Sequence, residues 1–434
     1  MKDTVITPDR RMPPPVTGFP DLSLPPFREY RLDNGIRMKV LDSGEEEVCR
    51  IALMWPQGVL DTDSPEAVGL MVNLLAEGCA GMSGKEINDL LEENGAWLRT
   101  TSALHSTLLV MQTLNSAAPR VLPVLASVIG DATFPEESFL SLRNKTASEK
   151  EMATRKPAYQ ATVLARRGFY GPGHPMAREI TAESIGATSR EAVIEVYDAI
   201  LRAVPPVVFV SGRVSGELLE TLSASLERIP FGTGKGERRV IMPPALSENL
   251  ILTKDMPDSL QTGVRIQIPT VSPDHPDYEA LRFAVAALGG YFGSRLMSNI
   301  REDKGYTYGI SAVLTDLPEG SCVVIACECD NAYSRAVLEE TDREIGRLAS
   351  VPPGEEEMET VRNVLISSMA GILDSPFYIS GYAELMESNG LPSGRFSRQF
   401  REIISMTPER VAYAAARYIR DARRVVALAG GKPG

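Results

Sequence analysis

Short runs of alternating apolar and polar residues are followed by apolar helical periodicities, and this order occurs twice along the chain. The first run, Val48–Met54, predicts a strand with one buried face. Glycines mark the breaks between the elements that follow. The first copy contains, in order, the strand Val48–Met54, a loop with Asp61, Asp63 and Pro65, the helix Ala67–Ala76, a break at Gly78–Gly81, the helix Gly84–Glu93, a turn at Asn94-Gly95, the strands Trp97–Ser102 and Ser106–Leu114, and the helix Ala118–Asp131.

The same order returns in the second half of the chain. Chance recurrence of common elements is the alternative, but a matching order over about 80 residues favours a duplication. Gly95 and Gly305 occupy equivalent places. The second copy contains the strand Thr262–Ile268, a loop with Pro273, Asp274 and Pro276, the helix Tyr278–Leu288, the break Gly289-Gly290, the helix Ser294–Glu302, the turn Lys304-Gly305, the strands Tyr308–Thr315 and Gly320–Glu328, and the helix Ala332–Leu348.

Each copy is followed by three more helices and a closing strand, ending at Val207–Ser211 in the first half and at Arg424–Leu428 in the second. This pattern predicts an α+β fold of two tandem homologous domains, each an antiparallel or mixed sheet covered by helices. We expect an extended N-terminal segment at 1–27, an N-terminal domain at 28–235, a glycine- and proline-rich linker at 236–248, and a C-terminal domain at 249–434.

Composition narrows the class of protein. The 434 residues exceed what one hydrophobic core usually organises, and the formal net charge of −12 argues against binding to nucleic acid or to an anionic membrane. No apolar run is long enough for a signal-peptide core or a membrane span, which predicts a cytoplasmic protein, or a periplasmic one if a leader was removed. Five cysteines in apolar surroundings predict buried, reduced thiols: Cys49, Cys79, Cys322, Cys327 and Cys329.

Several short segments carry a specific family signature. In the first half these are Pro65–Gly69 with the apolar helix that follows, and the later Gly81–Ser83. In the second half they are Leu288–Leu296 and Ile300–Tyr308. The chain resembles the insulinase/pitrilysin (inverzincin) peptidases over nearly its whole length, and its size is similar to that of the short bacterial members and of the mitochondrial processing peptidase. The resemblance implies a half-clam of two related halves.

Active members of that family carry H-x-x-E-H on the first apolar helix, where two histidines one turn apart grip zinc and a glutamate polarises the bound water. Here the three positions are occupied by Val72, Leu75 and Ala76, none of which can ligate zinc or move a proton. The downstream glutamate of the family corresponds to Glu149, with Glu151 as the competing assignment. We therefore expect no cofactor on this chain and zinc only on a partner subunit.

The resemblance also implies a retained pair, Arg301 and Tyr308, with Tyr306 as the alternative phenol. In the family an arginine and a tyrosine at these places reach towards the zinc-bearing half and hold the substrate and the oxyanion. A fixed guanidinium and a phenol suit that task. The structural alternative is a helix-terminal arginine and a packed strand tyrosine.

Three functions follow from these residues. The first is a catalytically inactive subunit that supplies Arg301 and Tyr308 in trans to a zinc-bearing sister chain of a heterodimeric metallopeptidase. The second is a structural or scaffolding homodimer that uses the fold as an assembly or peptide-binding surface. The third, an independent enzyme of unrelated chemistry, lacks a nucleophile or paired acid and base in the sequence. The strand Trp97–Ser102 matches the family's peptide-binding edge strand, although Arg99 and Thr100 depart from it and favour an ordinary exposed strand.

Overall fold

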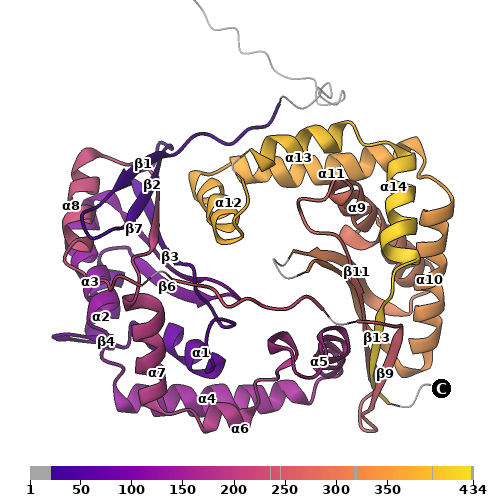
Figure 1. Ribbon diagram of the computed structural model, residues 1–434, viewed down its shortest axis with the longest axis horizontal. Coiled ribbons are helices and arrows are strands. Elements are labelled where there is room, and N and C mark those ends of the chain that lie inside the picture. Colours follow the sequence, from indigo (N-terminus) through magenta and orange to yellow (C-terminus); the bar gives the residue numbers. More distant parts are fainter. Residues whose placement is uncertain (1–20, 235, 245, 317–319, 393, 432–434) are drawn as a thin grey trace, which may run out of the picture.

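Two sheets, each covered by helices, face each other across the interior of the molecule (Figure 1). The computed structural model describes residues 21–234, 236–244, 246–316, 320–392 and 394–431. The predicted extended segment 1–27 lies mostly outside the described residues, and its described part, Asp21–Phe27, contains no helix or strand. The predicted α+β class is confirmed.

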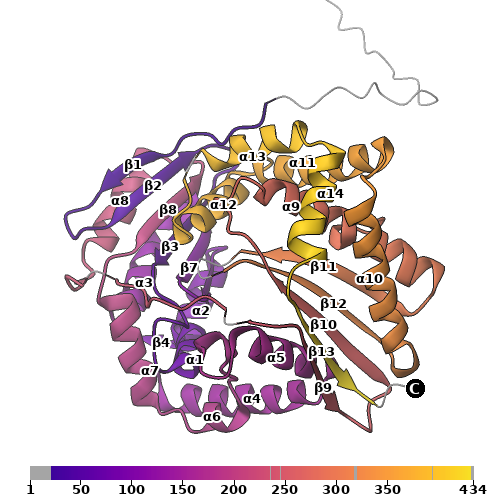
Figure 2. The ribbon, with the colours of Figure 1, turned by 45° about the vertical axis from the view of Figure 1, so that its right-hand side comes forward.

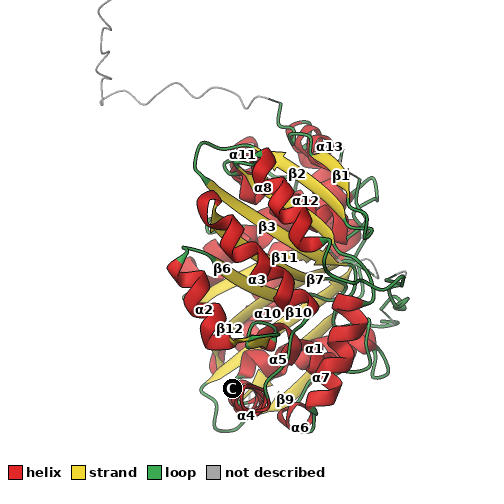
Figure 3. Cartoon of the chain, turned by 90° about the vertical axis from the view of Figure 1, so that its left-hand side faces the viewer, coloured by secondary structure: helices red, strands yellow, loops and turns green. Residues whose placement is uncertain are grey.

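The first sheet has the strand order β1-β2-β8-β3-β7-β6, and β2 runs parallel to β8 while the other neighbours are antiparallel. Helices α2, α3 and α8 lie over its outer face (Figure 3). Apolar residues of α1, α3, α7 and α8 pack with the strands into one core. The elements of this half are β1 (Arg28–Arg31), β2 (Arg37–Asp42), β3 (Val48–Trp55), α1 (Pro65–Leu74), β4 (Gly78–Cys79), β5 (Met82–Ser83), α2 (Gly84–Glu93), β6 (Trp97–Ser102), β7 (Thr107–Leu114), α3 (Ala118–Gly130), α4 (Glu136–Thr154), α5 (Pro157–Tyr170), α6 (Ala182–Gly186), α7 (Arg190–Tyr197), β8 (Val207–Gly212) and α8 (Gly216–Leu226).

The second sheet has the order β11-β12-β10-β13-β9, with β9 parallel to β13. A second core lies between this sheet and α9, α10, α11, α13 and α14. Its elements are β9 (Leu250–Asp255), β10 (Gln261–Pro269), α9 (Tyr278–Val285), the π-helical segments η4 (Ala286–Gly290) and η5 (Met297–Asp303), β11 (Thr307–Thr315), β12 (Cys322–Asp330), the 3₁₀ turn η6 (Asn331–Tyr333), α10 (Ser334–Ser350), α11 (Glu355–Leu373), α12 (Pro376–Ser388), α13 (Arg395–Ile404), α14 (Pro408–Ala415) and β13 (Val425–Gly430).

The two sheets have the same topology. Without the added edge strand β1, the order β2-β8-β3-β7-β6 corresponds strand by strand to β9-β13-β10-β12-β11. Gly95 and Gly305 both have left-handed backbone conformations, with φ of 62° and 67°, which glycine adopts without steric cost. The predicted duplication is therefore visible in the fold. Between α8 and β9 the described residues form no helix or strand. We propose that residues 236–248 of this stretch link the two domains.

One helix of each half packs on the sheet of the other half. Helix α5 of the first half packs on β9, β10 and β13, and α12 of the second half packs on β2, β3 and β8 (Figures 1 and 2). Glycine permits the close approach of α5, because a Cβ on Gly263 would lie 2.7 Å from the Ala158 nitrogen. Fully buried Phe169 fills the same contact. The exchange fixes the two sheets relative to one another.

Charged side chains hold α12 to the first sheet. The guanidinium of Arg50 donates to both carboxylate oxygens of Glu384, and both side chains are largely buried, with 13% and 6% exposed. Glu387 accepts from Arg37 at 2.8 Å and from Lys39 at 2.6 Å. Burial raises the pKa of Glu387, but these two cations outweigh it and hold the pKa below its usual value.

Several helix bounds differ from the predicted ones, and two of the differences lie near candidate site residues. The helix predicted at Ala67–Ala76 begins at Pro65 and ends at Leu74, so Leu75 and Ala76 lie just beyond its last turn. The helix predicted at Ser294–Glu302 is largely the π-helical segment η5, which ends at Asp303. Hydrophobic periodicity predicts that a helix exists more reliably than it predicts where the helix ends or whether its hydrogen bonding is α- or π-helical.

Two expectations from composition can be compared with the structure. All five cysteines are buried and free of disulfides, as predicted. No helix within the described residues is both long enough and apolar enough to cross a bilayer.

The Arg50–Glu384 pair gives the first testable prediction. Replacing Glu384 by alanine leaves a guanidinium buried without its counter-charge, so we expect the free energy of unfolding to fall by about 3–5 kcal/mol. The exposed pair Lys85–Asp89, with 83% and 52% of the side chains exposed, is the control, and Asp89→Ala should cost less than about 0.5 kcal/mol. Urea denaturation measures both, and equal losses would contradict the role of α12 in joining the halves.

Candidate functional site

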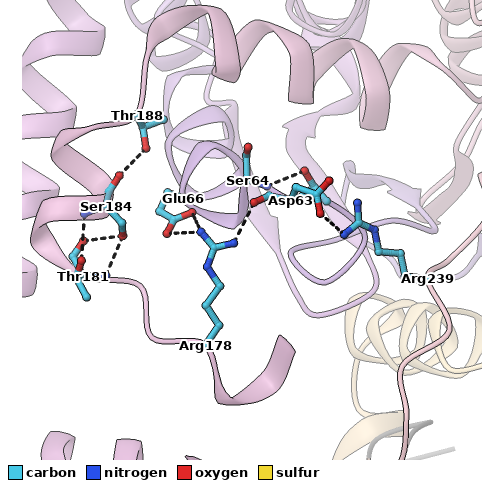
Figure 4. Close-up of polar contacts among 9 residues, drawn as sticks. Asp63, Ser64, Glu66, Arg178, Thr181, Ser184, Thr188 and Arg239 are labelled. Carbon is cyan, nitrogen blue, oxygen red and sulfur yellow. Dashed lines mark hydrogen bonds and ion pairs between the residues drawn. The ribbon is translucent and has the colours of Figure 1, made fainter. Parts of the chain in front are cut away.

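Helix α1, which contains Val72, the first of the three positions predicted to correspond to the zinc motif, is fixed at its N-terminus by an ionic network (Figure 4). The buried carboxylate of Glu66 accepts two hydrogen bonds of 2.9 Å from Arg178, which also donates to the Asp63 carbonyl at 2.9 Å. Arg239, from the segment that connects the two halves, donates to the Asp63 carboxylate at 2.7 Å. An acid in the first turn also favours the helix dipole. The network orders α1 and the connecting segment together.

The three positions of the zinc motif carry only hydrocarbon. Leu75 is fully buried in the first core, while Val72 and Ala76 are half-buried and pack against it. Val72 and Ala76 also line an open groove of about 430 Å³ together with the strand β6. The side chains of Val72, Leu75 and Ala76 carry no lone pair that could ligate a metal.

The carboxylate expected downstream lies on α4. Glu149 is exposed, and neighbouring Glu151 pairs with Arg155 at 2.9 Å. Across the described residues no group of three or more histidine, cysteine, aspartate or glutamate side chains is placed to hold a metal ion. The structure therefore gives Glu149 no metal-binding neighbours.

The three histidines lie in separate structural settings. His105 Nδ1 is 3.3 Å from Asp61, which also accepts backbone N–H bonds from Gly58 and Arg239. Burial raises the pKa of Asp61, but these hydrogen bonds outweigh it and leave the pKa below its usual value. His174 stacks on Tyr170, and His275 lies beside Tyr418.

Strand β6 borders the groove and is the last strand of its sheet. It pairs only with β7, so its other edge has unpaired backbone groups within the described fold. Trp97, Arg99 and Thr101 are exposed, and the residues between them are half-buried. An extended peptide can add to such an edge through main-chain hydrogen bonds.

Arg301 lies near the end of η5, in the second half. Its guanidinium carbon is 4.5 Å from the centre of the Phe292 ring, and Nη1 is 4.0 Å from Glu302. Nη1 is itself buried and has no hydrogen-bond partner in the described part of the chain, while one third of the side chain as a whole is exposed. The aromatic face holds the guanidinium in place.

Tyr308 lies on β11, the edge strand of the second sheet, with 93% of its surface exposed. Its side chain lines an open cavity of about 1090 Å³. The alternative phenol, Tyr306, is stacked on Tyr333 with ring centres 4.6 Å apart. Both tyrosines line this cavity, and Tyr308 is the more exposed of the two.

The structure places the predicted residues in separate surroundings. Val72 and Ala76 line the groove beside β6, Tyr308 lines the cavity of the second half, and Arg301 is among the described lining residues of neither. Sequence reasoning missed most of the cavity lining, which includes the β9–β10 loop Met256–Leu260 and Tyr333. These lining residues come together only because strands that are distant in sequence pair in the sheet. No sequence motif predicts that they share a cavity.

Comparison with known proteins gives consistent matches. Residues 187–365 match the family model described as "Peptidase M16 inactive domain". An uncharacterized zinc protease, YmxG of Bacillus subtilis, is 23% identical over 295 residues, which cover 65% of this chain and 69% of that protein. The mitochondrial-processing peptidase subunit beta of Bos taurus is 22% identical, with 94% of this chain and 85% of that protein covered.

The fold agrees with these matches. A solved structure of a peptidase M16 inactive domain from Pseudomonas fluorescens superposes with a TM-score of 0.83, covers 94% of this chain and 98% of that one, and is 23% identical. At this identity the superposition shows the fold alone. Taken with the matched domain and the related proteins, it shows that the chain is similar to the insulinase/pitrilysin (M16-like) peptidases, and most directly to their inactive domain.

Proposed function

We propose that this chain is a catalytically inactive subunit that supplies Arg301 and Tyr308 to the composite active site of a zinc-bearing sister subunit. One observation carries the proposal. The positions that the resemblance assigns to the zinc motif carry hydrocarbon side chains, while Tyr308 is 93% exposed and the side chain of Arg301 is one third exposed. A chain that lacks zinc ligands but has the arginine and the tyrosine fits a subunit whose donors act at the zinc site of another chain.

The chemistry of the pair suits peptide hydrolysis. Negative charge develops on the carbonyl oxygen as water adds to it, and preorganised donors lower the barrier to that step. A guanidinium held against Phe292 can approach the oxyanion without a large loss of side-chain entropy. Tyr308 offers a neutral O–H donor from the edge strand β11, at the irregularity in its pairing between Thr307 and Ile310. The sister subunit would contribute the metal and the activated water.

The related proteins support a partner of the same fold. The Bos taurus relative is named as a subunit, and the Bacillus subtilis relative is named as a zinc protease. We infer that the present chain pairs with a homologous chain with an intact H-x-x-E-H.

A second candidate is a structural or scaffolding homodimer that binds peptides without cleaving them. The groove of about 430 Å³ beside the unpaired edge of β6 favours it, because both persist without metal ligands. This function needs the groove and the edge strand but makes no use of Arg301 or Tyr308. The two candidates therefore differ in which half of the chain is essential.

Metal content is the first test of the proposal. We expect the purified chain, after exposure to zinc and removal of the excess, to hold far less than one zinc ion and to leave peptides uncut, because Val72, Leu75 and Ala76 donate no lone pair. Elemental analysis and a peptide-cleavage assay measure both properties, with the H-x-x-E-H homologue of the same organism as the positive control. Stoichiometric zinc with chelator-sensitive cleavage by the chain alone would contradict the proposal.

Mixing experiments test the role of the pair. Cleavage by the mixture of this chain and its zinc-bearing homologue should exceed that of either chain alone. Arg301→Ala or Tyr308→Phe should lower kcat by about 100-fold or more, the size expected for loss of one oxyanion donor, with unchanged zinc content. The effect should appear mainly in kcat because the donors act on charge that develops in the transition state.

Two matched variants control for general effects. Arg335, on α10, has 84% of its side chain exposed, and Tyr413, on α14, is 55% exposed. Arg335→Ala and Tyr413→Phe should leave kcat unchanged. A stable complex whose activity is insensitive to Arg301→Ala and Tyr308→Phe would favour the scaffolding function instead.

A further inference from the structure

A small pocket lies where the β1–β2 hairpin, the end of β3, helix α12 and the segment that connects the two halves meet. Its volume is about 230 Å³, below the range of pockets that enclose drug-sized molecules. The apolar part of the lining includes Met54 of β3 and the stretch Val204–Val207 at the start of β8. The size of the pocket therefore favours a small ligand.

The charge of the lining is unbalanced. The guanidiniums of Arg31, Arg37 and Arg238 line the pocket together with one carboxylate, that of Glu387. Three cations and one anion leave two positive charges without a counter-charge. Glu387 is moreover shared, since it also accepts from Lys39 at 2.6 Å. The chain as a whole has a net charge of −12, so the pocket has the opposite sign and would attract an anion.

The two arginines of the hairpin are placed directly opposite each other. Arg31 of β1 pairs with Arg37 of β2 in the antiparallel register, and directly opposed residues project from the same face of a sheet. Like charges in this position destabilise a hairpin. Arg37 donates to Glu387 at 2.8 Å, whereas the side chain of Arg31 forms no ion pair or hydrogen bond with the described residues. A bound anion would reduce the repulsion and give Arg31 a counter-charge.

Arg238 brings the third guanidinium from the connecting segment. Its Nε donates to the carbonyl of Pro56 at 3.1 Å, which fixes the side chain beside the end of β3. Its two Nη groups form no hydrogen bond or ion pair within the part of the chain that the structure describes. The neighbouring Arg239, in contrast, is paired with Asp63 at 2.7 Å. Arg238 therefore has donors left for an anion in the pocket.

We propose that this pocket binds the phosphate group of a small molecule, inorganic phosphate or a phosphate monoester. A phosphate monoester has a charge of about −1.5 to −2 at pH 7, which matches the two uncompensated positive charges. Guanidiniums bind phosphate oxygens through paired N–H donors, so three of them can contact several oxygens of one phosphate. A nucleic acid fits less well, because the net charge of −12 on the chain repels a polyanion.

Phosphate binding would join three parts of the chain. The hairpin belongs to the first half, Arg238 to the connecting segment and Glu387 to α12 of the second half. A ligand that binds only this folded arrangement stabilises it by mass action. The inference goes beyond the proposed function, since neither Arg301 nor Tyr308 is among the described residues that line this pocket. It makes the junction of the two halves sensitive to a ligand.

Titration of the full chain tests the inference. The probes are inorganic phosphate and glycerol 3-phosphate, and the controls are glycerol and potassium chloride at equal ionic strength, because exposed charges also respond to salt. We expect saturable binding of one phosphate group per chain in isothermal titration calorimetry, and a rise in the melting temperature that the controls do not produce. Tighter binding of the ester would assign the pocket to a phosphorylated metabolite and tighter binding of phosphate to the free ion, and either result supports the inference.

Variants of opposite charge separate binding from folding. Arg31→Gln/Arg238→Gln should weaken phosphate binding about tenfold or more, because charge-assisted hydrogen bonds are lost. Glu387→Gln should tighten it by about threefold, since the change removes the one carboxylate among the described lining residues. A purely structural effect would not change sign with the charge. The control is Arg335→Gln on α10, where 84% of the side chain is exposed, and it should leave the dissociation constant unchanged.

Three results would overturn the inference: no saturable binding of either phosphate probe, an equal effect of potassium chloride on the melting temperature, or a double variant that binds phosphate as tightly as the native chain. Circular dichroism checks the fold of each variant. The comparison of phosphate with chloride needs no variant at all.

Discussion

The exchange of helices α5 and α12 is the constraint on which the rest of the structure depends. A sheet with one face covered by its own helices still has a second apolar face to bury. In this chain each sheet buries that face under a helix from the other half, with Phe169 on one side and the Arg50–Glu384 pair on the other. In each half, the second face of the sheet is covered by a helix of the other half. The contacts that stabilise the two sheets therefore also set their relative orientation.

This arrangement does not depend on a metal site. A zinc site on α1 would contribute little to the packing of the halves, because α1 is held by its apolar face and by the Glu66–Arg178 network at its N-terminus. Leu75 even adds a fully buried side chain to the core. The second half keeps the rigid edge strand and the π-helical segment that present Tyr308 and Arg301. The structural framework and the catalytic chemistry are thus separable in this fold.

Much of the fold could be predicted from the sequence, because alternation and helical periodicity are local. The strand Trp97–Ser102 was predicted with its observed bounds, and the equivalent glycines Gly95 and Gly305 share a left-handed conformation. The altered zinc-motif positions and the pair Arg301 and Tyr308 come from the resemblance to the family and remain predictions. The exchange of α5 and α12, the π-helical segments and the cavity lining were not predicted, since each depends on contacts between distant parts of the chain. Asp258 and Tyr333 carry no signal until β9, β10 and β12 lie side by side.

A structure of this chain bound to its zinc-bearing homologue and an uncleaved peptide would test the central claim most directly. The account predicts that the guanidinium of Arg301 and the hydroxyl of Tyr308 lie within hydrogen-bond reach, about 3 Å, of the peptide at the partner's zinc. A complex in which the two chains pair through their outer helices, and in which both side chains face solvent away from the metal, would contradict it.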